Sequence, residues 1–212
     1  GEPILKVKQM LLGIEVKTEK EQVRVQKFEL NANRLLRLLD ELLRLEELAP
    51  GKLVGAMVPT RTNDLADSAI ASLVDYASNQ GIKLELQVAP LMVSADFERV
   101  VQVIVNLISN AIKFSFKGGT VLLRIVPEHG QVEFSVIDNG RGVPLEKQAQ
   151  IFKAYGQANA SDARVGTGLG LAICQTIIEA HGGTIGVESR ENKDNRGDGG
   201  SRFWFKLPAL EV

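Results

Sequence analysis

The sequence predicts an α+β protein, in which an N-terminal antiparallel helical hairpin precedes a two-layer α/β sandwich. Three observations predict this architecture. Apolar residues recur at helical spacing almost throughout residues 4–48, proline and glycine interrupt the pattern at residues 49–51, and strand-like and helix-like patterns alternate over the rest of the chain. We therefore expect a helical segment at residues 1–50 and a larger domain at residues 51–212.

The helical segment carries two wide apolar stripes. Apolar residues recur three and four positions apart over residues 4–14, and the same spacing returns over residues 28–42 after a polar stretch. Additional leucines widen the second stripe beyond what one antiparallel helix can cover. Two hairpins would bury such a face as a four-helix bundle, so we expect a homodimer formed through residues 1–50. Packing of this face on the rest of the same chain is the alternative.

The larger domain mixes strand and helix patterns. Gly81 is expected to close one helix, and His129-Gly130 to form the turn of a hairpin. We expect strands over residues 53–58, 82–88, 120–126, 131–137, 184–189 and 203–207, and helices over residues 64–80, 95–114 and 170–180, with a short helical patch at 147–155. These elements predict a mostly antiparallel sheet covered on one face by helices.

The composition excludes several classes of protein. The 212 residues are 44% hydrophobic and 24% charged, which is typical of a soluble globular protein, and the net charge of -1 favours neither nucleic acid nor an anionic membrane as partner. The single cysteine, Cys174, excludes an internal disulfide and a multi-cysteine metal site, and its apolar neighbours predict a buried thiol. No apolar run reaches the roughly 20 residues of a membrane span. We expect a cytoplasmic location without membrane contact.

The first candidate site lies on the predicted helix at residues 95–114, in the run Asn106-Leu-Ile-Ser-Asn110-Ala-Ile-Lys113-Phe114. Asn106 and Asn110 are four positions apart, so they share one face of the helix. Two carboxamide oxygens side by side suit a hard cation whose other ligands are water and phosphate. Lys113 follows about one turn later, where its point charge could meet a phosphate. Solvated asparagines on an amphipathic helix are the alternative.

Two glycine-rich runs follow. Asp138-Asn-Gly140-Arg-Gly142 comes directly after an apolar strand, where a carboxylate can accept a hydrogen bond from an exocyclic amine and glycines let the backbone approach a flat base. Gly166-Thr-Gly-Leu-Gly-Leu171 opens a predicted helix, whose free N–H groups and dipole favour phosphate. Each run alone is also a common turn signal.

Taken together, these runs resemble the asparagine box and the two glycine boxes of sensor histidine kinases, in the family's order. The run Ile151-Phe-Lys-Ala-Tyr155 is similar to the family's phenylalanine box, and the closing part of the chain also matches. The resemblance covers residues 1–208. It implies a Bergerat-type ATP site, which is shared with DNA gyrase, a class of heat-shock chaperones and mismatch-repair ATPases.

The resemblance implies a role for residues of each motif. Asn106 and Asn110 would hold Mg²⁺, and Arg164 would reach the terminal phosphate of ATP. Residues 143–165 would form a mobile lid. The remaining implied contacts to ATP are Lys113 on a phosphate, Phe114 beside the nucleotide, Asp138 on the adenine amine, Gly140 and Gly142 beside the base, Phe152 and Tyr155 as anchors of the lid, and Gly166, Thr167, Gly168, Leu169, Gly170 and Leu171 around the phosphates.

The identity of residue 106 bears on the reaction. In the ATP-hydrolysing members of the superfamily this position holds a glutamate that activates water, whereas the carboxamide of Asn106 cannot act as a general base. The resemblance therefore implies transfer of the γ-phosphate to a histidine within a homodimer. From there the phosphate would pass to an aspartate on the receiver domain of a response regulator.

The acceptor histidine of this reaction is not in the sequence. The chain contains His129, in a predicted turn, and His181, at a predicted helix end, and neither lies on the first helix, where the family carries its acceptor. Gly1-Glu2-Pro3 resembles the tail of the acceptor box, which places the histidine three positions before Gly1. Either the sequence begins just after that histidine, or the box is degenerate and the chain is a nucleotide-binding pseudokinase or scaffold module. An ATP-fuelled clamp or a serine kinase on the same fold is a third hypothesis, against which the leucine-rich hairpin argues.

Overall fold

The computed structural model describes residues 55–153, 168–190 and 199–210. The hairpin predicted at residues 1–50 lies outside this part of the chain. Within the described residues the elements are, in chain order, β1 (Val58–Arg61), α3 (Thr62–Ala71), α4 (Val74–Gln80), β2 (Lys83–Val88), β3 (Met92–Ala95), α5 (Phe97–Phe114), β4 (Thr120–Glu128), β5 (Gln131–Asp138), α6 (Leu145–Gln148), α7 (Gly170–Ala180), β6 (Thr184–Arg190) and β7 (Gly200–Pro208).

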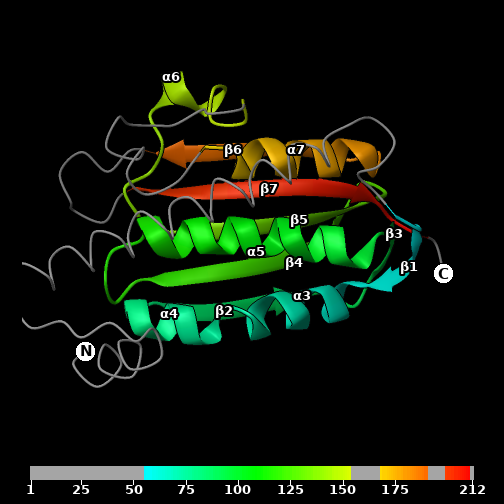
Figure 1. The fold of residues 1–212 in the computed structure, drawn as a ribbon, viewed down its shortest axis with the longest axis horizontal. Coiled ribbons are helices and arrows are strands. Elements are labelled where there is room, and N and C mark those ends of the chain that lie inside the picture. Colours follow the sequence, from blue (N-terminus) through cyan, green and yellow to red (C-terminus); the bar gives the residue numbers. More distant parts are fainter. Residues whose placement is uncertain (1–54, 154–167, 191–198, 211–212) are drawn as a thin grey trace, which may run out of the picture. The chain divides into compact units, whose positions relative to one another are not determined.

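Five strands form one sheet in the order β2-β4-β5-β7-β6. β2 runs parallel to β4, and the other neighbours are antiparallel. β1 and β3 form a separate antiparallel pair. The helices α3, α4, α5 and α7 lie over one face of the large sheet (Figure 1). For the described residues, the predicted two-layer sandwich with a mostly antiparallel sheet is confirmed.

The core lies between α5, α7 and the central strands. Buried and half-buried residues alternate along most of β4 and β7, as the period of two requires for a strand with one covered face, whereas the central strand β5 is buried along most of its length. Phe134 of β5 and Phe205 of β7 are opposite each other, and their rings stack with centroids 4.5 Å apart. α5 supplies apolar side chains at spacings of three and four, namely Val100, Val103, Ile104, Leu107, Ile108, Ala111 and Ile112.

The ends of α5 are set by local hydrogen bonding. The carboxylate of Asp96 accepts a hydrogen bond from the backbone N–H of Arg99 at 3.2 Å, which caps the helix, so it begins at Phe97 rather than at the predicted residue 95. The chain leaves the helix after Phe114, where Ser115 is extended. The partly exposed edge of this long helix carries Asn106 and Asn110.

The helix predicted over residues 64–80 is wrong as a single element, because it breaks into α3 and α4. The hydroxyl of Ser72 donates to the carbonyl of Ala69 at 2.7 Å, and the Ser72 N–H bonds back to Ile70. Such local bonds compete with continuation of a helix. The predicted end is confirmed, since Gly81 adopts a left-handed conformation with φ of 70° and terminates α4.

The short elements depart furthest from the sequence pattern. β1 begins at Val58 instead of residue 53, and β3 was not predicted at all. These strands have four residues each and pair with one another over a long sequence separation, Val58 opposite Ala95, so tertiary contact rather than local pattern defines them. The helical patch predicted at residues 147–155 is a single short helix, α6, which begins and ends earlier.

Both histidines lie at the ends of secondary-structure elements. His129 has a φ of 49° in the exposed β4–β5 turn, which confirms the predicted turn. His181 follows α7 as predicted, but it is buried, and its Nε2 accepts a hydrogen bond from the N–H of Asp96 at 3.1 Å. Its Nδ1 lies 2.7 Å from the carbonyl of Ile177, so Nδ1 carries the proton and the neutral ring joins the ends of two helices. Among the helices in the described residues, none has the length and apolarity that a membrane span requires.

Candidate functional site

The asparagine pair lies where α5 meets α7. Asn106 and Asn110 are half-buried, one turn apart on α5, while the intervening Leu107 and Ile108 point into the core. The Nδ2 group of Asn106 donates a hydrogen bond to the Sγ atom of Cys174 on α7, at 3.1 Å. The pair therefore occupies the boundary between the packed face of α5 and the surface.

The second glycine-rich run leads into α7 directly beside Asn106. Gly168 has a φ of 76°, which favours glycine, and Leu169 is 2% exposed and precedes the helix. A Cβ atom on Gly170 would lie 2.8 Å from Nδ2 and 2.9 Å from Oδ1 of Asn106. The fold thus brings the start of the α7 helix, where the first backbone N–H groups have no acceptor within the helix itself, to the asparagine pair.

Asp138 ends β5 and is only 5% exposed. Its Oδ1 atom accepts a hydrogen bond from the N–H of Gly140 at 2.8 Å, and it lies opposite Ser201 of β7 in the strand register. Burial raises the pKa of this carboxyl to about 6, against the lowering effect of hydrogen bonds from the backbone of Gly140 and Ser201. Above that pH the side chain is an ionised, buried acceptor whose orientation the Gly140 hydrogen bond fixes.

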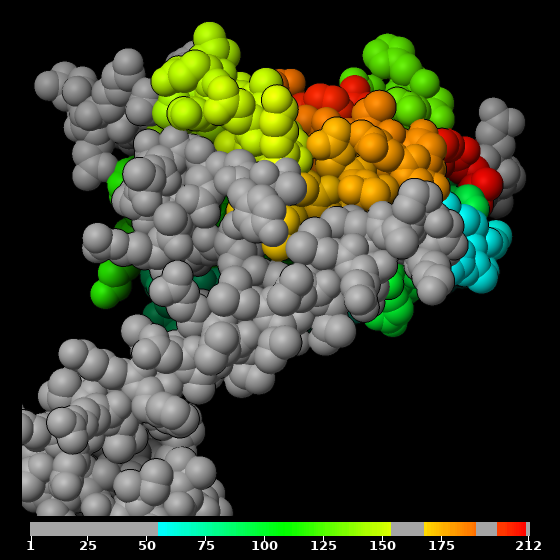
Figure 2. All heavy atoms as spheres, turned by 45° about the horizontal axis from the view of Figure 1, so that its top comes forward, coloured from blue at the N-terminus to red at the C-terminus, as the bar shows by residue number. Residues whose placement is uncertain are grey.

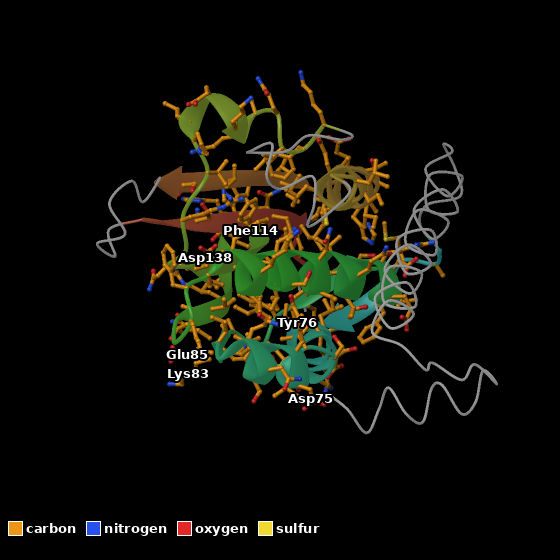
Figure 3. The ribbon with its side chains drawn as sticks, turned by 60° about the vertical axis from the view of Figure 1, so that its left-hand side comes forward. Asp75, Tyr76, Lys83, Glu85, Phe114 and Asp138 are labelled. Carbon is orange, nitrogen blue, oxygen red and sulfur yellow. The ribbon has the colours of Figure 1, made fainter. Side chains whose placement is uncertain are left out.

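Phe114 connects the asparagine helix to the first glycine-rich run. The Nζ of Lys113 lies 4.7 Å from the centroid of its ring, and the guanidinium of Arg141 lies 4.4 Å from it. A Cβ on Gly140 would collide with the carbonyl oxygen of Phe114. Figure 3 shows Phe114 and Asp138 close together, away from Asp75 on α4. The turn after β5 therefore packs on the end of α5.

A cluster around Ser189 holds the segment after Gly142, and sequence reasoning missed it. The Ser189 hydroxyl accepts a hydrogen bond from the Val143 N–H at 2.7 Å and donates to the Gly200 carbonyl at 2.8 Å. Because the Ser189 hydrogen is used in this way, the Ser201 hydroxyl donates to the Ser189 oxygen, at 2.9 Å. Gln148 of α6 donates to the carbonyls of Val143 and Ser189. We call Val143, Gln148, Ser189, Gly200 and Ser201 the Ser189 cluster.

Several predicted site residues lie away from these contacts or outside the described part of the chain. Phe152 is half-buried in the turn after α6, beside the buried Ile151. Figure 2 shows α6 and this turn, in yellow-green, on the surface next to α7 and β6. Gly142 has a φ of 74°, and Leu171 is half-buried on α7. Outside the described residues are Tyr155, Arg164, Gly166 and Thr167.

The donor atoms at the asparagine pair fit a hard cation only if other groups complete its coordination. Within the described residues no three His, Cys, Asp or Glu side chains gather into a metal site. Two neutral carboxamide oxygens fit Mg²⁺, which keeps several waters and is commonly completed by substrate phosphates. Asn106 and Phe114 are eight residues apart on α5, about 12 Å along the axis. An elongated ligand with a planar base at one end and anionic groups at the other matches this spacing.

The comparison with protein families agrees with this geometry. A sequence model of the family described as histidine kinase-, DNA gyrase B- and HSP90-like ATPase matches residues 95–211. The sensor protein KdpD of Clostridium acetobutylicum is 35% identical over 176 residues, which are 82% of this chain and 19% of KdpD. The signal transduction histidine-protein kinase BarA of Escherichia coli K12 is 34% identical over 188 residues, 84% of this chain and 20% of BarA. The chain thus spans about one fifth of the length of these relatives.

Solved structures show the same likeness. Full-length ShkA in complex with AMPPNP superposes with a TM-score of 0.76 at 28% identity, over 93% of this chain and 41% of ShkA. The histidine kinase ThkA in complex with the response regulator protein TrrA superposes with a TM-score of 0.71 at 25% identity, over 99% of this chain and 56% of that one. The resemblance predicted from the sequence motifs is confirmed. The chain belongs to the histidine kinase-, DNA gyrase B- and HSP90-like ATPase family, and its relatives are sensor histidine kinases of two-component systems.

Proposed function

We propose that this chain binds Mg²⁺-ATP and transfers the γ-phosphate to a histidine, from which it passes to an aspartate on a response-regulator receiver domain. The observation that carries the proposal is the meeting of three separated motifs on α5. Asn106 lies against Gly170 at the start of α7, and Phe114 lies against the turn that holds Asp138. These contacts support a polar base-binding end near Asp138 and a cation- and phosphate-binding end near Asn106.

At the base-binding end, Asp138 would accept a hydrogen bond from the adenine amine. Its burial excludes competing water, and the hydrogen bond from Gly140 fixes its orientation. Gly140 and Gly142 leave room for the base to approach the backbone. Phe114 would cover the nucleotide, with Arg141 already stacked on its ring.

At the phosphate-binding end, Asn106 and Asn110 would hold Mg²⁺ through their carboxamide oxygens, and Lys113 would contact a phosphate. The bound ion would neutralise phosphate charge during transfer. The α7 start, with Gly168, Leu169, Gly170 and Leu171, would surround the phosphates with backbone N–H groups. Arg164, Gly166, Thr167 and the lid residues Phe152 and Tyr155 complete the proposed set.

The nature of residue 106 favours transfer to a protein group over hydrolysis. The Asn106 carboxamide cannot take a proton from water. The γ-phosphoryl group therefore needs a nucleophile that reacts without a general base at this position. A neutral imidazole is such a nucleophile: its nitrogen forms the new bond to phosphorus as the bond to ADP breaks.

Neither histidine of this sequence suits the acceptor role. The ring nitrogens of His181 are engaged by Asp96 and Ile177, and the residue is buried. His129 precedes β5 whereas Asp138 ends it, so the two are separated by the length of the strand, about 24 Å or more. We therefore propose that the acceptor precedes Gly1, on a hairpin that pairs with a second copy as a homodimer. The ThkA complex supports a response regulator as the next partner.

The experiment is phosphate incorporation from γ-labelled ATP and Mg²⁺ into the chain extended by its native upstream residues. We expect an acid-labile, base-stable label that disappears in the Asn110→Asp variant, which would still fold. AMPPNP binding is measured in parallel by calorimetry. Binding without any label would contradict the kinase function and support a nucleotide-binding scaffold; absence of both would contradict the proposal as a whole.

A further inference from the structure

We propose that Cys174 and Gly170 of α7 are positioning residues that hold the carboxamide of Asn106 with its oxygen available to the cation. The inference rests on the proposed Mg²⁺-ATP function, because it concerns how one ligand of the ion is oriented. It assigns to a buried thiol a part in nucleotide binding, although the thiol itself touches neither the ion nor the nucleotide.

The first observation is the hydrogen bond from Nδ2 of Asn106 to Sγ of Cys174, at 3.1 Å. A carboxamide has a donor end and an acceptor end, and only the oxygen can bind a cation. Because the sulfur engages the nitrogen end, the oxygen end remains for the ion. Cys174 is 1% exposed, so its sulfur meets the Asn106 carboxamide inside the packed contact between α5 and α7.

The second observation concerns Gly170, one turn before Cys174 on α7. Its missing side chain leaves a flat surface against which the Asn106 carboxamide lies, since a Cβ there would come within 2.8 Å of Nδ2 and 2.9 Å of Oδ1. Both ends of the amide would be displaced by any larger residue. Gly170 and Cys174 thus restrain the same group from the same helix face, as residues four apart must.

These restraints have a consequence for binding because Mg²⁺ demands near-ideal octahedral geometry. A carboxamide that rotates by half a turn presents an NH₂ group to the ion and repels it. The restraining atoms belong to α7, whose start is the proposed phosphate-binding segment. Cation and phosphate binding are therefore coupled through this contact.

The test compares AMPPNP affinity with and without Mg²⁺, by calorimetry on the full chain. Cys174→Ala removes the acceptor, and we expect it to reduce the Mg²⁺-dependent gain in affinity about fivefold, the effect of one hydrogen bond, with Mg²⁺-free binding unchanged. Cys174→Ser keeps an acceptor at the same place and should recover most of the gain. Ile178→Val is the matched control, since it trims a fully buried side chain near the other end of α7 and should leave the gain intact.

The melting temperature of each variant separates positioning from general destabilisation. A Cys174→Ala protein that keeps the full Mg²⁺-dependent gain would overturn the inference while the wild type still supports the proposed function. Equal losses in Cys174→Ala, Cys174→Ser and Ile178→Val would also overturn it, because they would follow stability alone. If the wild type shows no Mg²⁺-dependent gain, the proposed cation role of Asn106 and this inference fail together.

Discussion

The two ends of the candidate site are built from different kinds of structure. Around Asp138 the contacts are strand register and backbone hydrogen bonds: Gly140 donates to its carboxylate, and Ser201 lies opposite on β7. Around Asn106 the contacts are side chains where two helices meet, with Cys174 and Gly170 on α7. We call these regions the strand-built end and the helix-built end.

The difference teaches how each end can be altered. Backbone hydrogen bonds in a sheet are shared along the register, so a change at the strand-built end disturbs several residues at once. A helix–helix contact made by one carboxamide and one thiol can change without moving the backbone. The strand-built end should therefore resist tuning, whereas single substitutions should adjust the helix-built end.

The largest effect is expected where the strand-built end meets α5. Gly140→Ala should destabilise the domain by about 3 kcal/mol, because the new Cβ collides with the Phe114 carbonyl and lies 2.9 Å from Oδ1 of Asp138. Urea denaturation measures the free energy of unfolding. The control is Gly130→Ala, which meets open space and should cost only about 1 kcal/mol for its φ of 78°. Equal costs would mean that the Phe114 contact relaxes around the new Cβ and costs no more than the left-handed strain of an alanine at Gly130.

The next effect separates binding from stability at the strand-built end. Asp138→Asn should weaken AMPPNP binding about 30-fold, since it removes a charged acceptor for the adenine amine. The same change should not lower the free energy of unfolding, because it removes a buried charge that folding has desolvated. Asp75→Asn, on the exposed surface of α4, is the matched control for binding and should leave the affinity unaltered. Unchanged affinity in Asp138→Asn would remove Asp138 from the site.

The pH dependence should have opposite signs for folding and for binding. Because burial raises the pKa of Asp138 to about 6, the folded state holds its proton more tightly than the unfolded chain. Stability from this group is therefore present at low pH and is lost as pH rises from about 4 through 6. Nucleotide affinity follows the carboxylate instead and should fall about tenfold from pH 8 to pH 5. The pH dependence of affinity in Asp138→Asn gives the contribution of the nucleotide phosphates alone. The same pH dependence in the variant and the wild type would contradict the assignment to Asp138.

The sequence predicted the long elements and the motif residues because their signals are local. Seven apolar positions on α5 and the left-handed glycine after α4 are readable from spacing and residue type. β3 and the break at Ser72 were missed because pairing with β1 and a side-chain bond to Ala69 decide them. Cys174 was predicted to be buried, which is confirmed, but its partner Asn106 lies 68 positions away. The four-residue spacing of Gly170 and Cys174, which places them on one helix face, was the only sequence signal that both could contact the same neighbour.

A smaller effect is expected from the Ser189 cluster, which ties the segment after Gly142 to β6 and β7. Ser189→Ala leaves the Val143 N–H and the Ser201 hydroxyl without their acceptor, so unfolding should become easier by about 1 kcal/mol. The free energy of Mg²⁺-free AMPPNP binding should weaken by a similar amount, because this segment adjoins the Asp138 turn. Ser109→Ala, whose hydroxyl only bonds the carbonyl of Asn106 within α5, is the control for loss of a hydroxyl. A loss of stability with unaltered affinity would confine the cluster to a structural role.

The finest test asks whether the two ends act independently. Among the residues that the structure describes, Ser189 and Cys174 share no hydrogen-bond partner: Ser189 bonds to Val143, Gly200 and Ser201, and Cys174 to Asn106. The free-energy changes of Ser189→Ala and Cys174→Ala in AMPPNP binding should therefore add in the double variant to within about 0.5 kcal/mol. The Mg²⁺-dependent part should follow Cys174 alone, and the Mg²⁺-free part Ser189 alone. A larger coupling would show that strain at the strand-built end reaches Asn106 through α5, and the distinction between the two ends would then fail for binding even though it holds for their construction.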